Sequence, residues 1–255
     1  MKYQRNQIYS DFLTLVYKSH VGHIGSCLSV LDILIALYFR IKRKNDIILL
    51  SKGHAAPALY TVLNACGLLP KKVLNTFHDN GTTLPVHVPH RLIKGIPFSS
   101  GSLGHGLSLA AGIAQANKFK KKTGNIYCIM SDGECNEGQV WEAAQYASAY
   151  KLNNLIALVD INGIQAFGKT KDVLGDTTAE KWRAFGWNTY ECNGHSIEEI
   201  VKTHKKIKKS DKPTIILCRT IKGYGLPFFE NKIESHYLPL SEKQYLQGLS
   251  LFKSL

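Results

Sequence analysis

The chain has 255 residues, 44% hydrophobic and 20% charged, an ordinary composition for a globular protein with one large core. Its start has no apolar signal region, and its longest apolar run, about a dozen residues, is too short for a membrane span of roughly 20 residues. The six cysteines are scattered without a C-x-x-C pair, which favours reduced thiols over a disulfide framework or a zinc site. We therefore expect one cytoplasmic domain over residues 1–255, with no membrane contact.

The net charge of +13 is concentrated in lysine-rich pieces, notably "NKFKKKTGN" and "KTHKKIKKSDKP". Of the 32 basic residues 26 are Lys, whereas Arg is the better bidentate partner of phosphates and bases. No aromatic pattern of the base-stacking kind accompanies these runs. We therefore do not expect nucleic-acid binding, and both solvated helix faces and contact with an acidic partner stay open as explanations.

Short β-rich runs alternate with helical stretches along the whole chain. The expected strands are 46–50, 125–130, 154–161, 186–192 and 214–220. The expected helices lie near 7–19, 28–41, 56–66, 103–122, 137–151, 177–185 and 196–208. This alternation predicts an α/β fold with a doubly wound, mainly parallel sheet and helices on both faces. In such folds, ligands bind beyond the carboxyl ends of the strands.

Two of the expected strands end in polar segments. "SDGECNEG" (131–138) follows one strand and "DINGIQAFG" (160–168) ends the next, so Asn162 lies 30 residues after Asp132. Asp-Gly alone is more often a turn, but consecutive parallel strands bring these two ends side by side. A carboxylate, a carboxamide and a nearby carbonyl suit Mg²⁺ or Ca²⁺, with phosphate oxygens or water completing the shell.

Glycine-rich and histidine-containing loops add further candidates. "SSGSLGHGLSLAAG" opens the helix near 103–122, where exposed backbone N–H groups favour anions. Close packing between helices accounts for such a glycine-rich helix start about as often. Several histidines stand beside Gly or Pro in expected loops, where functional groups are common. His78, His195 and His204 are expected to be structural, and His105 is undecided.

The ordered motifs resemble the N-terminal, thiamine-diphosphate-binding half of transketolase, in particular the separately encoded N-terminal subunits of split transketolases. The resemblance runs from "SHVGHIGSCLSVLDILIALYF" through "SKGHAAPALY", "GSLGHGLSLAAGIAQA", "SDGECNEGQVWEAA" and "NLIALVDINGIQAFG" to "ESHYLPL". It implies the thiamine-diphosphate-binding fold, thiamine diphosphate with Mg²⁺ or Ca²⁺ as cofactors, and transfer of a two-carbon ketol unit from a ketose (phosphate) to an aldose (phosphate).

The resemblance also implies roles for individual residues. The metal ligands are Asp132, Asn162 and the carbonyl of Ile164. These three also count as cofactor-binding residues, together with His54, Gly101, Ser102, Leu103, Gly133, Glu134 and His236. The expected catalytic residues are the pocket histidines His23, His54, His87 and His236, with Glu137 and Glu142. The two glutamates match buried acids near the subunit interface, and purely structural interface or capping carboxylates are the alternative.

The chain departs from the family at three positions. It has Ile24 where Pro is usual, His105 where Gln is usual, and "VHV" around His87 in place of Gly-His-Pro. The first change is expected to affect only the local turn, and the other two are expected at the pocket, where they leave the substrate open.

The chain ends at Leu255 without the family's pyrimidine-binding half. We therefore expect activity only with a C-terminal partner subunit, in a heterotetramer of two plus two chains. One alternative is that the chain belongs to a related thiamine-diphosphate enzyme, either a specialised ketol transferase or a 2-oxo-acid dehydrogenase α-type component. A more distant alternative is a non-enzymatic basic binding module.

Overall fold

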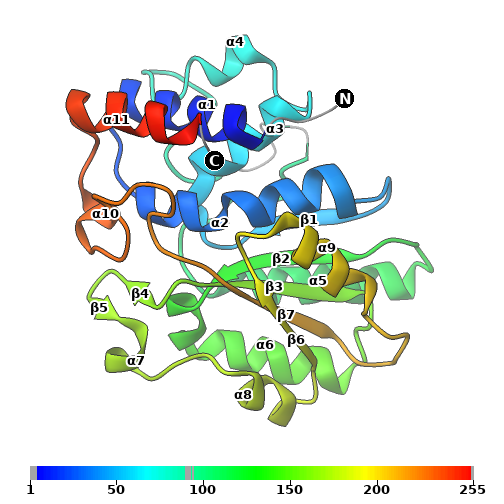
Figure 1. Ribbon diagram of the computed structural model, residues 1–255. Helices are drawn as coiled ribbons and strands as arrows, with labels where there is room; N and C mark the ends of the chain where they lie inside the picture. Colours follow the sequence, from blue (N-terminus) through cyan, green and yellow to red (C-terminus); the bar gives the residue numbers. More distant parts are fainter. Residues whose placement is uncertain (1–4, 90–92, 94, 254–255) are drawn as a thin grey trace.

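A five-stranded parallel sheet forms the centre of the computed structural model, which describes residues 5–89, 93 and 95–253 (Figure 1). The strand order is β1-β2-β3-β7-β6, and every neighbouring pair is parallel. The strands are β1 (Ile47–Leu50), β2 (Ile126–Ser131), β3 (Leu155–Ile161), β7 (Thr214–Arg219) and β6 (Asn188–Asn193). Since all five run the same way, their carboxyl ends share one edge of the sheet.

Helices cover both faces of this sheet, as expected for a buried parallel sheet. Along β1, Ile48 and Leu50 pack into one apolar cluster and Leu49 into the other, because successive side chains point to opposite faces. The first face carries α1 (Arg5–Lys18), α2 (Ile24–Ala36), α3 (Ala56–Ala65) and α9 (Ile197–Lys205); the second carries α5 (His105–Phe119), α6 (Gly138–Ala149) and α8 (Ala179–Ala184). The doubly wound α/β fold predicted from the sequence is confirmed.

Helix α2 lies between the sheet and the outer layer of α1, α3 and α11 (Glu242–Phe252) (Figure 1). It continues into the π-helical turn Leu37–Ile41, so the segment Ile24–Ile41 has 18 residues, a mean hydropathy of 1.8 and 83% of its residues buried. The expectation that this segment is too short for a membrane span was wrong, because the helix extends beyond the apolar run of about a dozen residues at both ends. By length and composition this segment passes the test for a membrane span. A helix that is apolar all round and packed in this way is also typical of a protein core.

The expected strands and helices are all present, with boundaries shifted by up to four residues. The sequence interpretation missed α11, although its Ser241-x-x-Gln244 pattern is a start signal and forms a capping box in the structure. It also missed the short elements α4 (Lys71–Leu74), α7 (Thr170–Val173) and α10 (Glu234–Tyr237), and the hairpin of β4 (Ile164–Gln165) and β5 (Gly168–Lys169). The hairpin and α10 matter for function, because both flank the carboxyl edge of the sheet (Figure 1).

Candidate functional site

A pocket of about 270 Å³ opens at the carboxyl ends of β2 and β3. It is formed by the start of α2, the loops after β1, β2, β3 and β7, the glycine-rich segment before α5, and α10. Its lining includes His23, Ser26, His54, His87, Gly101, Leu103, Asp132, Gly133, Glu134, Glu137, Asn162, Ile164, Lys222 and His236. Most of the residues expected from the sequence therefore meet in one pocket.

Four histidines from distant parts of the chain converge in this pocket. The ring centre of His23 lies 5.3 Å from His54, 6.1 Å from His87 and 4.8 Å from His236. His54 and His236 are 5.8 Å apart. The structure thus brings the four histidines expected from the sequence together, and their roles stay a prediction.

A close approach between two chain segments holds His23 beside His236. The backbone of His23 is left-handed (φ 61°), and its N–H donates to the carbonyl of His236 at 2.9 Å. Any Cβ at Gly22 would lie 2.7 Å from the carbonyl oxygen of Tyr237, so only glycine fits there. The "VGH" turn therefore fixes the relative position of two pocket histidines.

His23, His54 and His236 are neutral at physiological pH, because the pKa of each is lowered. Burial, together with repulsion from His87 and from nearby lysines, lowers the pKa of His23 to about 4. Burial and the nearby Lys222 lower the pKa of His236 to about 3, and burial with Lys52 lowers the pKa of His54 well below its usual value. A neutral imidazole can donate through one ring nitrogen and accept through the other, which suits recognition of sugar hydroxyls.

The expected metal ligands line the same wall of the pocket. Asp132 accepts from the backbone N–H of Gly133 at 2.8 Å and from that of Gly163 at 2.6 Å. Burial and the nearby Asp160 raise the pKa of Asp132 to about 6. The Asn162 side chain is turned into the same loop, where its oxygen accepts from the N–H of Ile164 at 3.1 Å.

This donor set fits a hard divalent cation. In the described part of the chain, no group of three or more His, Cys, Asp or Glu side chains is arranged to hold a metal. One carboxylate, one carboxamide and one main-chain carbonyl leave room for phosphate oxygens and water, which Mg²⁺ prefers to keep. A cation would also balance the buried charge of Asp132.

The sequence interpretation did not identify two buried lysines, of which Lys222 lines the pocket and Lys52 lies behind its wall. Lys222 is 1% exposed, and its ammonium donates to the carbonyl of Ile164 at 2.9 Å and lies 3.2 Å from Nδ1 of His236. Burial and repulsion from Lys52 lower the pKa of Lys222 to about 8. Lys52 is fully buried, forms an ion pair with Asp160 and donates to the carbonyl of Ser26 at 3.0 Å. The Lys-Gly-Tyr-Gly turn after β7 was the available sequence signal for Lys222.

Glu134 positions the pocket loops through three hydrogen bonds. Its buried carboxylate accepts from the hydroxyl of Ser51, from the N–H of Gly104 at 2.7 Å and from the N–H of Ser131 at 3.3 Å. Burial raises its pKa. It therefore ties the glycine-rich segment before α5 to the turn that presents Asp132.

Several expected site residues lie outside the pocket wall. Gly101 and Leu103 line the pocket, whereas Ser102 is exposed and does not. His105 also lies outside, bonded through Nδ1 to the carbonyl of Ser102 at 3.2 Å, so the expectation of a pocket position for it was wrong. The departure at His87 does face the pocket, and Ile24 begins α2 within the core.

The two glutamates expected as buried interface acids are exposed in this chain. Glu137 precedes α6 and lines the pocket, and Glu142 lies on the outer side of α6 away from it. This chain alone therefore does not bury the two carboxylates, and the side of α6 that carries Glu142 faces away from the sheet. Their place at an interface between subunits stays a prediction.

A second polar network supports the loop that carries Lys222. The buried carboxylate of Asp32 accepts from both Arg5 and Tyr9 and lies 3.3 Å from Nδ1 of His195. Nε2 of His195 accepts from the N–H of Ile221 at 2.8 Å, which assigns the ring proton to Nδ1. His195 thus has the structural role expected from the sequence, directly beside the lysine of the pocket.

Comparison with known proteins identifies the family. The family profile described as "Transketolase, thiamine diphosphate binding domain" matches residues 6–248. The chain belongs to the transketolase family. Its membership agrees with the resemblance seen in the sequence motifs and with the position of those motifs around one pocket.

The relatives include both separate subunits and full-length transketolases. The chain is 40% identical, over 96% of its length and 93% of the relative, to the 6-deoxy-6-sulfo-D-fructose transketolase subunit SqwG of Clostridium sp.. It is 38% identical to an apulose-4-phosphate transketolase subunit of Phocaeicola vulgatus, covering 92% and 87% of the two chains. It matches 36% of human transketolase at 38% identity.

Solved transketolases share the fold. The Campylobacter jejuni transketolase superposes with a TM-score of 0.83 at 28% sequence identity, covering 99% of this chain and 43% of that one. The Leishmania mexicana transketolase has a TM-score of 0.88 at 22% identity, which shows the common fold.

Proposed function

We propose that this chain is the N-terminal subunit of a thiamine-diphosphate-dependent transketolase, which moves a two-carbon ketol unit from a ketose donor to an aldose acceptor. The observation that carries the proposal is the convergence of Asp132, Asn162 and the Ile164 carbonyl with Lys222 and four histidines in one pocket. A diphosphate with a divalent cation would match this combination of hard oxygen ligands and a buried ammonium group.

The chain's own residues would bind and orient the cofactor. Asp132, Asn162 and the Ile164 carbonyl would hold the metal ion, and the ammonium of Lys222 would face the diphosphate. Gly133 presents bare backbone on this wall, and only glycine fits there, since any Cβ would lie 2.8 Å from Cβ of Gln165. Thiamine diphosphate, when bound, supplies the nucleophilic carbon that accepts the two-carbon unit.

The pocket histidines would handle the sugar. The neutral rings of His23, His54 and His236 can donate to a substrate oxygen on which negative charge develops and accept from a hydroxyl on another atom. His87 is the most exposed of the four and stands at the pocket mouth, so we assign it to the substrate rather than to the diphosphate.

We further propose that a second polypeptide completes the site. Relatives of matching length are themselves named as transketolase subunits, one for a sulfosugar and others for apulose 4-phosphate. The partner would supply the pyrimidine-binding half, in an assembly of two plus two chains. We propose a ketose or ketose phosphate as donor and an aldose or aldose phosphate as acceptor.

Calorimetric titration of the assembled enzyme with thiamine diphosphate and Mg²⁺ tests the metal assignment. Asp132→Ala and Asn162→Ala should each weaken cofactor binding by at least about tenfold, because each removes a hard ligand. Asp172→Ala, which removes an exposed carboxylate from the nearby helix α7, is the matched control and should have no effect. Unchanged affinity in both ligand variants would refute the assignment.

Steady-state kinetics of the same assembly test the histidines. His87→Ala and His236→Ala should lower turnover more than they lower cofactor affinity, since their rings would act on the substrate. Wild-type rates in both variants would assign these histidines a structural role.

A further inference from the structure

The excess positive charge of the chain lies on the edge of the sheet opposite the pocket. Four segments lead into the amino ends of strands: 40–46 before β1, 118–125 before β2, 150–154 before β3 and 202–213 before β7. They contain 15 Lys or Arg residues and two Asp, a net charge of +13. All other residues together contain 17 basic and 17 acidic side chains. This amino edge therefore carries the whole net charge of the protein.

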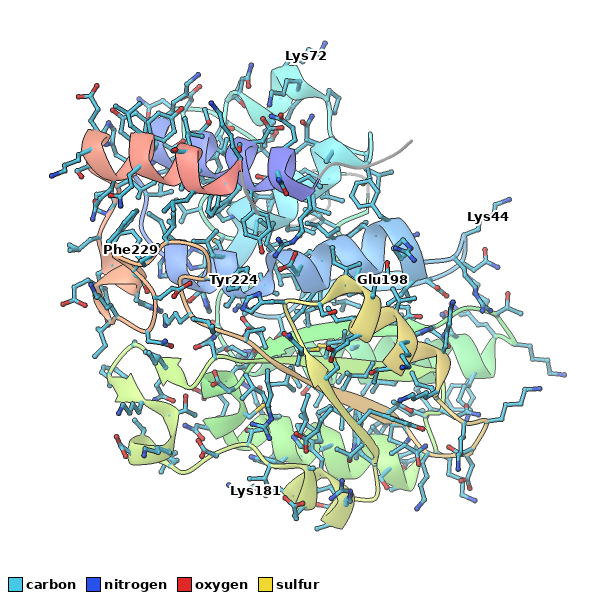
Figure 2. The ribbon with its side chains drawn as sticks, viewed as in Figure 1. Lys44, Lys72, Lys181, Glu198, Tyr224 and Phe229 are labelled. Carbon is cyan, nitrogen blue, oxygen red and sulfur yellow. The ribbon has the colours of Figure 1, made fainter. Side chains whose placement is uncertain are left out.

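Hydrogen bonds join the four segments into one surface. Asn45 donates to a threonine hydroxyl of the segment before β2 at 2.9 Å. Lys118 donates to the carbonyl of Lys151 at 2.7 Å, and Asn153 donates to a carbonyl of the segment before β7 at 3.0 Å. Figure 2 shows Lys44 projecting from this side of the molecule. The positive charges are thus held close together.

Helix stabilisation explains only part of this charge. Lys118 lies in the last turn of α5, and Lys202 and Lys205 lie in the last turn of α9, where cations interact favourably with the helix dipole. Lys120 and Lys206 are the C-cap residues of the same two helices, and the other lysines of the edge lie beyond the last helical turns. The two carboxylates of this edge have partners of their own. Asp46 accepts from two backbone N–H groups, and Asp211 forms an ion pair with a lysine of the same edge. So dense a charge of one sign destabilises the folded chain through self-repulsion.

A hollow of about 510 Å³ lies within this surface, between all four segments. Its size is typical of small-molecule sites. The floor is polar, since His204 is bonded to the hydroxyl of Tyr127 at 2.9 Å. The basic and amide groups around the hollow are Arg43, Asn125, Asn153, Lys205, Lys208, Lys209 and Lys212.

We propose that this hollow binds a small ligand that carries two or more phosphate groups. Lysine binds phosphate as a point charge, so several lysines around a concavity suit a chain of phosphates. A concave site favours a compact ligand over a nucleic acid or a membrane, both of which require an extended surface. The hollow lies on the edge opposite the transketolase pocket, so the proposal does not depend on the proposed function.

Titration calorimetry of the full chain with inorganic tripolyphosphate tests this site. We expect saturable one-to-one binding below about 1 mM at low salt, weakening as salt screens the exposed lysines. The triple variant Lys208→Gln, Lys209→Gln, Lys212→Gln should weaken binding about tenfold. The control is Lys71→Gln, Lys72→Gln, Lys243→Gln, which removes the same charge from exposed positions on other elements and should leave binding unchanged (Lys72 is at the top of Figure 2).

Three results would overturn the proposal. Equal weakening in both triple variants would show an effect of net charge alone. Absence of saturation by about 10 mM tripolyphosphate at low salt would show that no site exists. The edge would be a macromolecular surface if it bound a single-stranded oligonucleotide, phosphatidylserine vesicles or the partner polypeptide and tripolyphosphate failed to displace that ligand. Thermal unfolding of each variant confirms that the fold is intact.

Discussion

Replacing Lys222 by Met tests whether this lysine serves cofactor binding or the stability of the fold. The side chain is 1% exposed, and its pKa of about 8 is lower than the usual 10.5 because burial disfavours the charged form. At pH 7, below both values, this charge costs the folded chain about 3 kcal/mol, which is relieved as pH rises from 8 to 10.5. Met fills a similar volume without charge but leaves the Ile164 carbonyl and His236 without their donor, at about 1 kcal/mol each.

Removing the buried charge of Lys222 is expected to have opposite effects on the stability of the free chain and on cofactor binding. The cofactor-free Lys222→Met chain should be as stable as the wild type or about 1 kcal/mol more stable in urea unfolding at pH 7. The assembled enzyme should bind thiamine diphosphate at least about tenfold more weakly, because a charged hydrogen bond to phosphate contributes about 1.5–3 kcal/mol. A clear loss of stability with unchanged cofactor affinity would refute the reasoning.

Three further predictions follow from the pocket and its supports. Between pH 7 and pH 5 the wild type should lose about 2 kcal/mol more stability in urea unfolding than His23→Gln does, since the folded pKa of His23, about 4, lies below that of the unfolded chain; equal losses in the two chains would contradict this. Gly25→Ala would place a Cβ 2.2 Å from Oγ of Ser235 and should lower stability by about 1–3 kcal/mol, whereas Gly112→Ala, with open space around it, should be neutral or stabilising in the same assay. His195→Ala removes the acceptor of the Ile221 N–H and should speed amide hydrogen exchange in the loop that carries Lys222; an unchanged rate would exclude the supporting role.

The sequence predicted those parts of the site that depend on topology. Consecutive parallel strands separated by one helix bring Asp132 and Asn162 to the same edge, and the spacing alone was sufficient to place them together. The four histidines were found through loops that contain Gly or Pro and through the resemblance to the family. Their convergence depends on backbone contacts such as that between His23 and His236, which no local pattern encodes.

Other features depend on packing that the sequence does not reveal. The burial of Lys52 had no sequence signal in a chain so rich in lysine, and the only signal for Lys222 was its place in the Lys-Gly-Tyr-Gly turn. Glu142 was expected to be buried, but burial at an interface between subunits is a property of two chains. Helix α11 was missed despite its capping box, because it lies beyond the last motif of the resemblance.

Ketol transfer by the reconstituted pair of subunits is the most direct test of the proposed function. This chain, the C-terminal transketolase subunit, and their mixture would each be assayed with a ketose donor and an aldose acceptor, with and without thiamine diphosphate and Mg²⁺. The account predicts two-carbon transfer only in the mixture and only when both cofactors are present. Full activity of this chain alone, or transfer by the mixture without thiamine diphosphate, would contradict it.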